Sequence, residues 1–168
     1  PFGHRRELDK PDYEEGDGWV QTCNLCAISL NKEYTDEEYA DICYWSLKII
    51  DYVIDNSDYE MTQIGATTKK WRTAGVSVLN LANYLAVNNL NYSTTKSKQR
   101  IHELFERHEY FLLEASLRIS KERGLAEWIH KTKYPEGYIP LDDYNKNVDK
   151  IADFTYKYDW MDLKRRIK

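Results

Sequence analysis

Two cysteines three positions apart, Cys23 and Cys26, are the residues best suited to chemistry. A Cys-x-x-Cys pattern can form a redox dithiol pair, which usually sits at a helix N-terminus, or half of a zinc site. Here both cysteines lie in the apolar run 19–30, which has the composition of a buried strand. Side chains three positions apart on a strand point to opposite faces. One thiol can then face a site while the other packs in the core.

The other candidate ligands do not complete a zinc site. Such a site needs four nitrogen or sulfur ligands, and the chain has no second paired motif. Cys43 falls within a predicted amphipathic helix, where core packing explains it. His102 and His108 lack metal-ligand spacing and are expected at solvated or core-edge positions, and His4 and His130 are scattered. An alternative stays open in which all three cysteines are small buried hydrophobic residues.

Composition and charge exclude several classes of function. The chain has 24 Lys and Arg against 28 Asp and Glu, a formal net charge of -4. This charge gives no electrostatic attraction to nucleic acid or to an anionic membrane. No apolar run approaches the roughly 20 residues that cross a bilayer, and the chain has no secretory signal. We therefore expect a cytoplasmic protein without a nucleic-acid or membrane partner.

A strand and an amphipathic helix must position the cysteines. The strand is predicted within 19–30, and Thr35 with Glu38 forms a capping box for a helix from Asp36 to Asp55. Apolar residues recur along that helix at three- and four-residue steps, so we expect them to face the core. They are Ile42, Trp45, Ile49, Ile50 and Val53.

The rest of the chain is predicted to be mainly helical. After a polar stretch around Gly65, the run 71–89 is expected to begin as a strand near Gly75 and to continue as a helix. The longest helix is predicted from Ser97 to Arg123, with Gly124 as its C-cap. Beyond it we expect a short helical stretch near Trp128, a turn at Pro135 and Gly137, a helix from Leu141 to Ile151, and a basic helix from Trp160.

Four stretches in order resemble the large subunit of class I ribonucleotide reductases. They are TCNLCAISLN, WRTAGVSVLNLANYLA, YFLLEASLRISKERG and KTKYPEGYIPLDDY, and together they cover most of 22–144. The closing YDWMDLKRRI is similar to the family's segment just before its phosphate-binding loop. The resemblance implies a fold that is mainly α with a few strands, as part of a ten-stranded α/β barrel. Residues 1–168 would then form a single fragment, with a loop over 1–18 followed by a strand and outer helices.

The resemblance also implies an oxidoreductase that converts ribonucleoside diphosphates to deoxyribonucleotides for DNA synthesis by thiyl-radical chemistry. Cys23 occupies the place of one member of the family's redox cysteine pair, whose disulfide partner would lie outside this chain. Asn24 and Cys26 begin to spell the family's radical motif Asn-x-Cys-x-Glu, but Ile28 stands where the acid is required. Cys26 replaces what is commonly a small residue and is a secondary candidate thiol.

The implied partners are the remainder of the large subunit, the small subunit, a thioredoxin- or glutaredoxin-type reductant and the ribonucleotide substrate. No cofactor is expected in this chain, because the metal-radical cofactor belongs to the small subunit. The chain alone should have no turnover and is expected to be either a piece of a longer polypeptide or a split-gene product. Two alternatives remain: an independent Cys-x-x-Cys dithiol oxidoreductase, and a non-catalytic helical scaffold or interaction domain.

Overall fold

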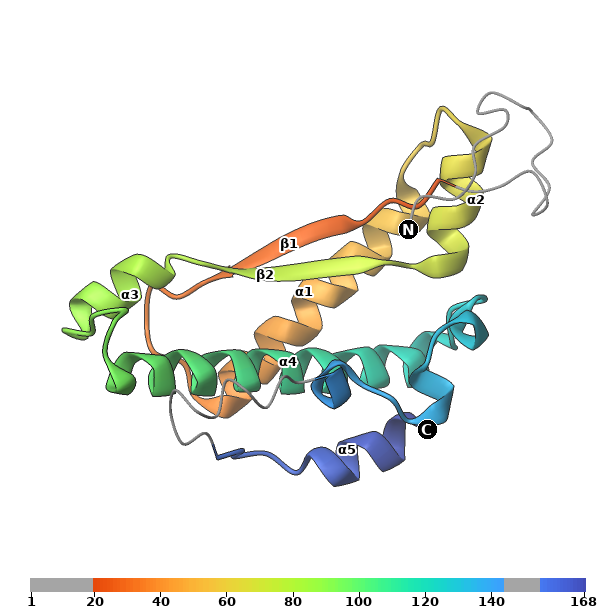
Figure 1. The fold of residues 1–168 in the computed structure, drawn as a ribbon. Coiled ribbons are helices and arrows are strands. Elements are labelled where there is room, and N and C mark those ends of the chain that lie inside the picture. The colour runs from red at the N-terminus through yellow and green to blue at the C-terminus, as the bar shows by residue number, and fades with distance from the viewer. Residues whose placement is uncertain (1–19, 144–154) are drawn as a thin grey trace.

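The computed structural model describes residues 20–143 and 155–168, and in these ranges the chain is mainly helical. The two strands lie side by side above α1 and α4, and α5 lies on the far side of α4 (Figure 1). The first elements in order are β1 (Asn24–Ser29), α1 (Asp36–Asn56), α2 (Thr62–Trp71), β2 (Ala74–Leu79), α3 (Leu81–Val87) and α4 (Thr95–Arg123). In the described residues, the short 3-10 helices η2 (Ile129–Lys131), η3 (Tyr134–Glu136) and η4 (Pro140–Asp143) follow, and then α5 (Trp160–Ile167).

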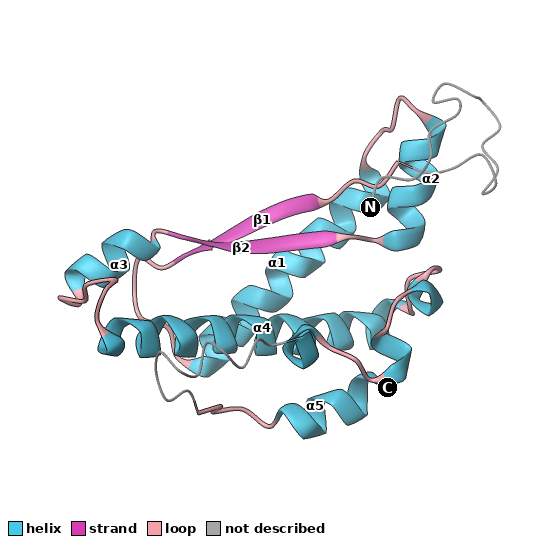
Figure 2. Ribbon diagram, viewed as in Figure 1, coloured by secondary structure: helices cyan, strands magenta, loops and turns pink. Residues whose placement is uncertain are grey.

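The sheet of the described residues is a parallel pair with one face on the helices (Figure 2). Asn24 pairs with Ala74, and the register continues to Ser29 and Leu79. Ile28 of β1 packs in a core cluster with residues of α1 and α4. Because successive strand side chains alternate between faces, the neighbours of Ile28 point the other way. This second face is open in the described part of the chain, since Leu25 is 78% and Leu79 54% exposed.

Helix α1 confirms the predicted start but not the predicted buried face. Thr35 accepts a hydrogen bond from the Glu38 amide, and the Glu38 side chain accepts one from the Thr35 amide, which completes the capping box. The inward prediction was right for Ile50, which is buried, and for Ile42, which packs against the core cluster. It was wrong for Trp45 and Ile49, which are 58% and 57% exposed. Val53 is 40% exposed as well. Helix α1 carries apolar residues on two faces, and periodicity alone does not say which one meets the sheet. The face buried in this structure carries Tyr39, Cys43, Tyr44, Ile50 and Ile54.

Helix α2 was not predicted, because its sequence TQIGATTKKW has a glycine, three threonines and no capping side chain. Hydrogen bonds to other parts of the chain hold it in place instead. The hydroxyl of Thr67 donates to the Val20 carbonyl at 2.5 Å, and the hydroxyls of Thr68 and Thr22 lie 2.6 Å apart. The helix therefore depends on tertiary contacts that local propensity does not report.

The strand near Gly75, the long helix α4 with its Gly124 C-cap, and α5 from Trp160 confirm the predictions for these segments. The strand predicted within 19–30 is β1, which covers Asn24–Ser29. The helix predicted from Leu141 begins in a 3-10 turn, and its part beyond 143 lies outside the described residues, as does the loop predicted for 1–18. No helix in the described ranges is both long and apolar enough to cross a membrane.

Candidate functional site

The three cysteines lie in three different environments, and all are free thiols. Cys23 is exposed immediately before β1, Cys26 is half-buried within it, and Cys43 is completely buried in α1. Burial raises the pKa of the Cys43 thiol to about 12. The thiolate is the reactive form of cysteine, so Cys43 serves the core, as its position on the helix predicts. The alternative in which all three cysteines are buried is wrong for Cys23.

Cys23 and Cys26 do not form a local pair. Cys26 is in register with Val76, whose side chain packs toward the helices, whereas Cys23 is exposed beside the open face of the sheet. Extended chain advances about 3.3 Å per residue, which separates their Cα atoms by roughly 10 Å, while a disulfide needs them within about 7 Å. The expectation that the two thiols point to opposite faces is confirmed, with Cys23 exposed and Cys26 half-buried. Cys23 and Cys26 are therefore too far apart to form the disulfide that an independent dithiol oxidoreductase would need.

The residues around Cys23 are fixed to α2 and to the start of β2. The Asn24 amide donates to the Thr73 carbonyl at 3.3 Å, and the Gln21 side chain donates to the Thr73 hydroxyl at 3.2 Å. The Thr22 hydroxyl contacts that of Thr68. Among the residues that the structure describes, the one hydrogen-bond contact of the Cys23 sulfur is a long one, 3.8 Å to the Asn24 carbonyl. The backbone at Cys23 is thus held firmly while the thiol stays available.

An ion-pair cluster fixes the turn that leads into β2. Arg72 ends α2 in the left-handed conformation, with φ of 51°, which is uncommon for a residue other than glycine. Its guanidinium donates to Asp51 at 2.6 Å and to Asp55 at 2.7 Å, and Arg123 of α4 pairs with the same two carboxylates. The hydrogen bond from Arg72 lowers the pKa of Asp55. The cluster joins α1, α4 and the start of β2, and the sequence does not reveal it because its members are far apart in the chain.

His108 links α4 to the back of the sheet. Its Nε2 lies 2.8 Å from the Val76 carbonyl, and its Nδ1 lies 2.9 Å from the Tyr39 hydroxyl. A carbonyl only accepts, so Nε2 carries the proton and Nδ1 of the neutral ring accepts from Tyr39. Burial lowers the pKa of His108, which favours this neutral form. His108 is therefore a buried structural residue, rather than the solvated or core-edge residue that was predicted.

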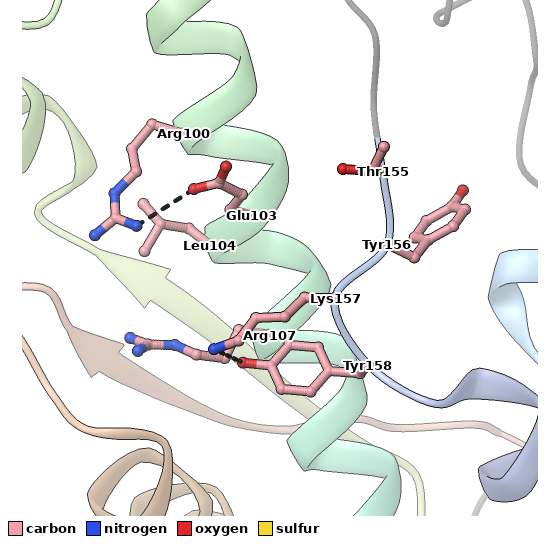
Figure 3. Close-up of a pocket in the computed structure, with 8 residues that line it drawn as sticks. All are labelled: Arg100, Glu103, Leu104, Arg107, Thr155, Tyr156, Lys157 and Tyr158. Carbon is pink, nitrogen blue, oxygen red and sulfur yellow. Dashed lines mark hydrogen bonds and ion pairs between the residues drawn. The ribbon is translucent and has the colours of Figure 1, made fainter.

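A cavity of about 420 Å³ lies between α4 and the segment 155–158 (Figure 3). Its three cations are all paired with carboxylates, so it offers no excess positive charge to an anion. The pairs are Arg100 with Glu33 and Glu103, Arg107 with Asp36, and Lys157 with Asp36. None of the cysteines lines this cavity. Within 20–143 and 155–168, no group of three or more His, Cys, Asp or Glu side chains is arranged to hold a metal ion.

Comparison with known proteins gives the class to which this chain belongs. The family model of the ribonucleotide reductase barrel domain matches residues 7–168. The match covers nearly the whole chain, so the chain belongs to this family, and the resemblance found in the sequence is confirmed.

Individual relatives specify the class further. The chain is 31% identical over 157 residues to the ribonucleoside-diphosphate reductase subunit alpha of Buchnera aphidicola, a match covering 94% of this chain and 21% of the relative. The protein of the same name from Enterobacteria phage T4 is 33% identical over 164 residues, covering 96% of this chain and 21% of the relative. The ribonucleoside-diphosphate reductase 1 subunit alpha of Escherichia coli is 36% identical over 115 residues, or 68% of this chain and 15% of the relative. The chain thus spans between 15% and 21% of the length of these relatives.

Proposed function

We propose that this chain is part of the large subunit of a ribonucleoside-diphosphate reductase and that Cys23 is one of its redox-active cysteines. The observation that carries this role is the position of the thiol. Cys23 is exposed beside the face of the β1–β2 pair that the helices leave open, on a backbone anchored to α2 and β2. In a barrel whose helices lie outside, this open face would line the interior, where a substrate binds.

The chemistry requires two thiols and no other reductant at the substrate. Replacing the ribose hydroxyl by hydrogen consumes two electrons and two protons and releases water, and two cysteine thiols supply both as they form a disulfide. Cys23 would contribute one thiol, and a cysteine outside this chain the other. An external dithiol of the thioredoxin or glutaredoxin type then restores the pair by thiol–disulfide exchange. The radical that starts the reaction would come from the metal-radical cofactor expected in the small subunit.

Two surfaces of the chain support assembly with the rest of a large subunit. The outer edges of β1 and β2 have no strand partner among the described residues, and such edges readily pair with further strands. The outer face of α1 carries exposed Trp45, Ile49 and Tyr52 at helical spacing, which suits packing against another helix. We therefore propose that the chain is a fragment of the ten-stranded α/β barrel, to which it supplies two strands and several outer helices. Residues 1–168 act as one unit of that barrel.

The test is deoxyribonucleotide formation by the natural polypeptide that carries this segment, combined with the remaining large-subunit parts, the small subunit, a ribonucleoside diphosphate and a dithiol reductant. Cys23→Ser should abolish multiple turnover, because one of the two reducing thiols is missing. Cys26→Ser is the matched control, since it removes a thiol only three residues further along the chain, and it should retain most activity. Full activity of Cys23→Ser would contradict the proposed role.

The same assay separates the two rival functions. An independent dithiol oxidoreductase would need both Cys23 and Cys26, so both variants would be inactive. A non-catalytic scaffold would need neither cysteine. Only the proposed role makes the two variants differ in the stated direction.

A further inference from the structure

Gly75 of β2 lies beside Cys23, and the side chains of Cys23 and Leu25 fill the space that its missing side chain leaves. Gly75 lies directly opposite Leu25 in the parallel register. A Cβ atom added to Gly75 would lie 2.8 Å from Leu25 Cδ2 and 3.3 Å from Cys23 Sγ. Real Cβ atoms essentially never approach another atom closer than 3.0 Å. Any other residue at this position would therefore press on both side chains.

Backbone conformation does not explain the glycine. Gly124 and Gly137 have positive φ angles, but Gly75 does not, so an alanine could adopt its backbone conformation. The contact at 2.8 Å involves the end of a flexible leucine side chain that is 78% exposed and can rotate away. What an alanine at Gly75 would change is the space around the Cys23 sulfur.

We propose that Gly75 is a positioning residue for the Cys23 thiol, leaving room for the sulfur over β2 and for the group that reacts with it. The inference rests on the proposed function, because the space matters when Cys23 exchanges with a disulfide. In that exchange a new S–S bond forms to one sulfur of the disulfide while the old bond breaks, and the other sulfur departs as a thiolate. The attacking and departing sulfurs must be roughly aligned, which requires open space beside Sγ. The Leu25 side chain borders the same space beside Gly75.

The test compares two disulfide-forming reagents on Cys23 in the natural polypeptide. Dithiobis(nitrobenzoate) is bulky and aromatic, and methyl methanethiosulfonate is small. All variants carry Cys26→Ser, because no lysine or arginine separates the two cysteines and they share one tryptic peptide. Mass spectrometry of that peptide then gives the modification rate at Cys23 alone.

Gly75→Ala should slow the modification of Cys23 by the bulky reagent about tenfold. This corresponds to roughly 1.4 kcal/mol of added steric repulsion when the reagent approaches the sulfur. The small reagent should be slowed much less. Adding Leu25→Ala to Gly75→Ala removes the tighter contact and should restore most of the rate with the bulky reagent. Ser77→Ala, two residues further along β2, is the matched control and should change neither rate.

Equal effects on both reagents, no effect on either, or no rescue by Leu25→Ala would overturn the proposal. Modification of the buried Cys43 in Gly75→Ala would overturn it too, because Gly75 would then serve the fold rather than the thiol. These rates do not depend on turnover. A failure of the proposed function would appear separately, as an active Cys23→Ser enzyme.

Discussion

Glu106 anchors the C-terminal segment to α4, and its removal gives a prediction whose magnitude follows from three hydrogen bonds. The side chain is buried, and its Oε1 accepts from the Lys157 amide at 2.8 Å, the Tyr158 amide at 3.2 Å and the Trp160 indole at 3.0 Å. A hydrogen bond to a charged group contributes about 1.5–3 kcal/mol, and bonds that share one oxygen do not add fully. We therefore expect Glu106→Ala to destabilise the local attachment by about 3 kcal/mol.

Amide hydrogen exchange measures this loss without requiring the whole protein to unfold reversibly. Under conditions where the segment recloses faster than its open amides exchange, about 3 kcal/mol corresponds to roughly a hundredfold faster exchange for the amides of Lys157 and Tyr158. Glu103→Ala is the control, since Glu103 lies on the same helix but pairs with Arg100 near the surface, and it should leave these amides unchanged. Unchanged exchange in Glu106→Ala would refute the role of Glu106 as the anchor of this segment.

Two further predictions concern the supports of β2. Because burial lowers the pKa of His108 below its usual 6.5, the unfolded state takes up the proton first as pH falls. The contribution of His108 to stability is thus fully present above pH 6.5 and is lost as pH drops below it. The thermal midpoint should therefore decrease less between neutral and mildly acidic pH in His108→Gln than in the unsubstituted protein. An equally steep fall in that variant would contradict the assignment. Arg72→Ala should destabilise the protein by about 2 kcal/mol, because it leaves Asp51 and Asp55 with Arg123 alone, and an unchanged thermal midpoint would contradict this. Arg72→Lys keeps the charge but loses the bidentate geometry, so a thermal midpoint of Arg72→Lys equal to that of the unsubstituted protein would show that this geometry is unimportant.

The parts of the fold that local signals determine were predictable from the sequence. The capping box at Thr35 and the C-cap at Gly124 set the start of α1 and the end of α4. Helix α2 was missed because its threonines are held by contacts with Val20 and Thr22, which only the folded chain brings close. The buried face of α1 was misjudged because its residues, Trp45 among them, form a second apolar face that remains exposed in this chain.

The candidate site was predictable in part. Alternation along a strand separated Cys23 from Cys26 before the structure was known, and the resemblance to a family singled out Cys23. The neighbours of Cys23 on β2 were not predicted, because they depend on a register that no local pattern gives. A glycine inside a strand often marks a close approach of another group, so Gly75 did carry a signal that could have been used.

In the proposed role, Cys23 forms a disulfide with a cysteine outside this chain when substrate is reduced. The most direct measurement is one turnover by the assembled enzyme without external reductant, followed by peptide mapping of the disulfides. We predict a bond from Cys23 to a cysteine that lies beyond residues 1–168, formed in proportion to the deoxyribonucleotide produced. Deoxyribonucleotide formed while Cys23 remains a free thiol, or a bond between Cys23 and Cys26, would contradict the claim.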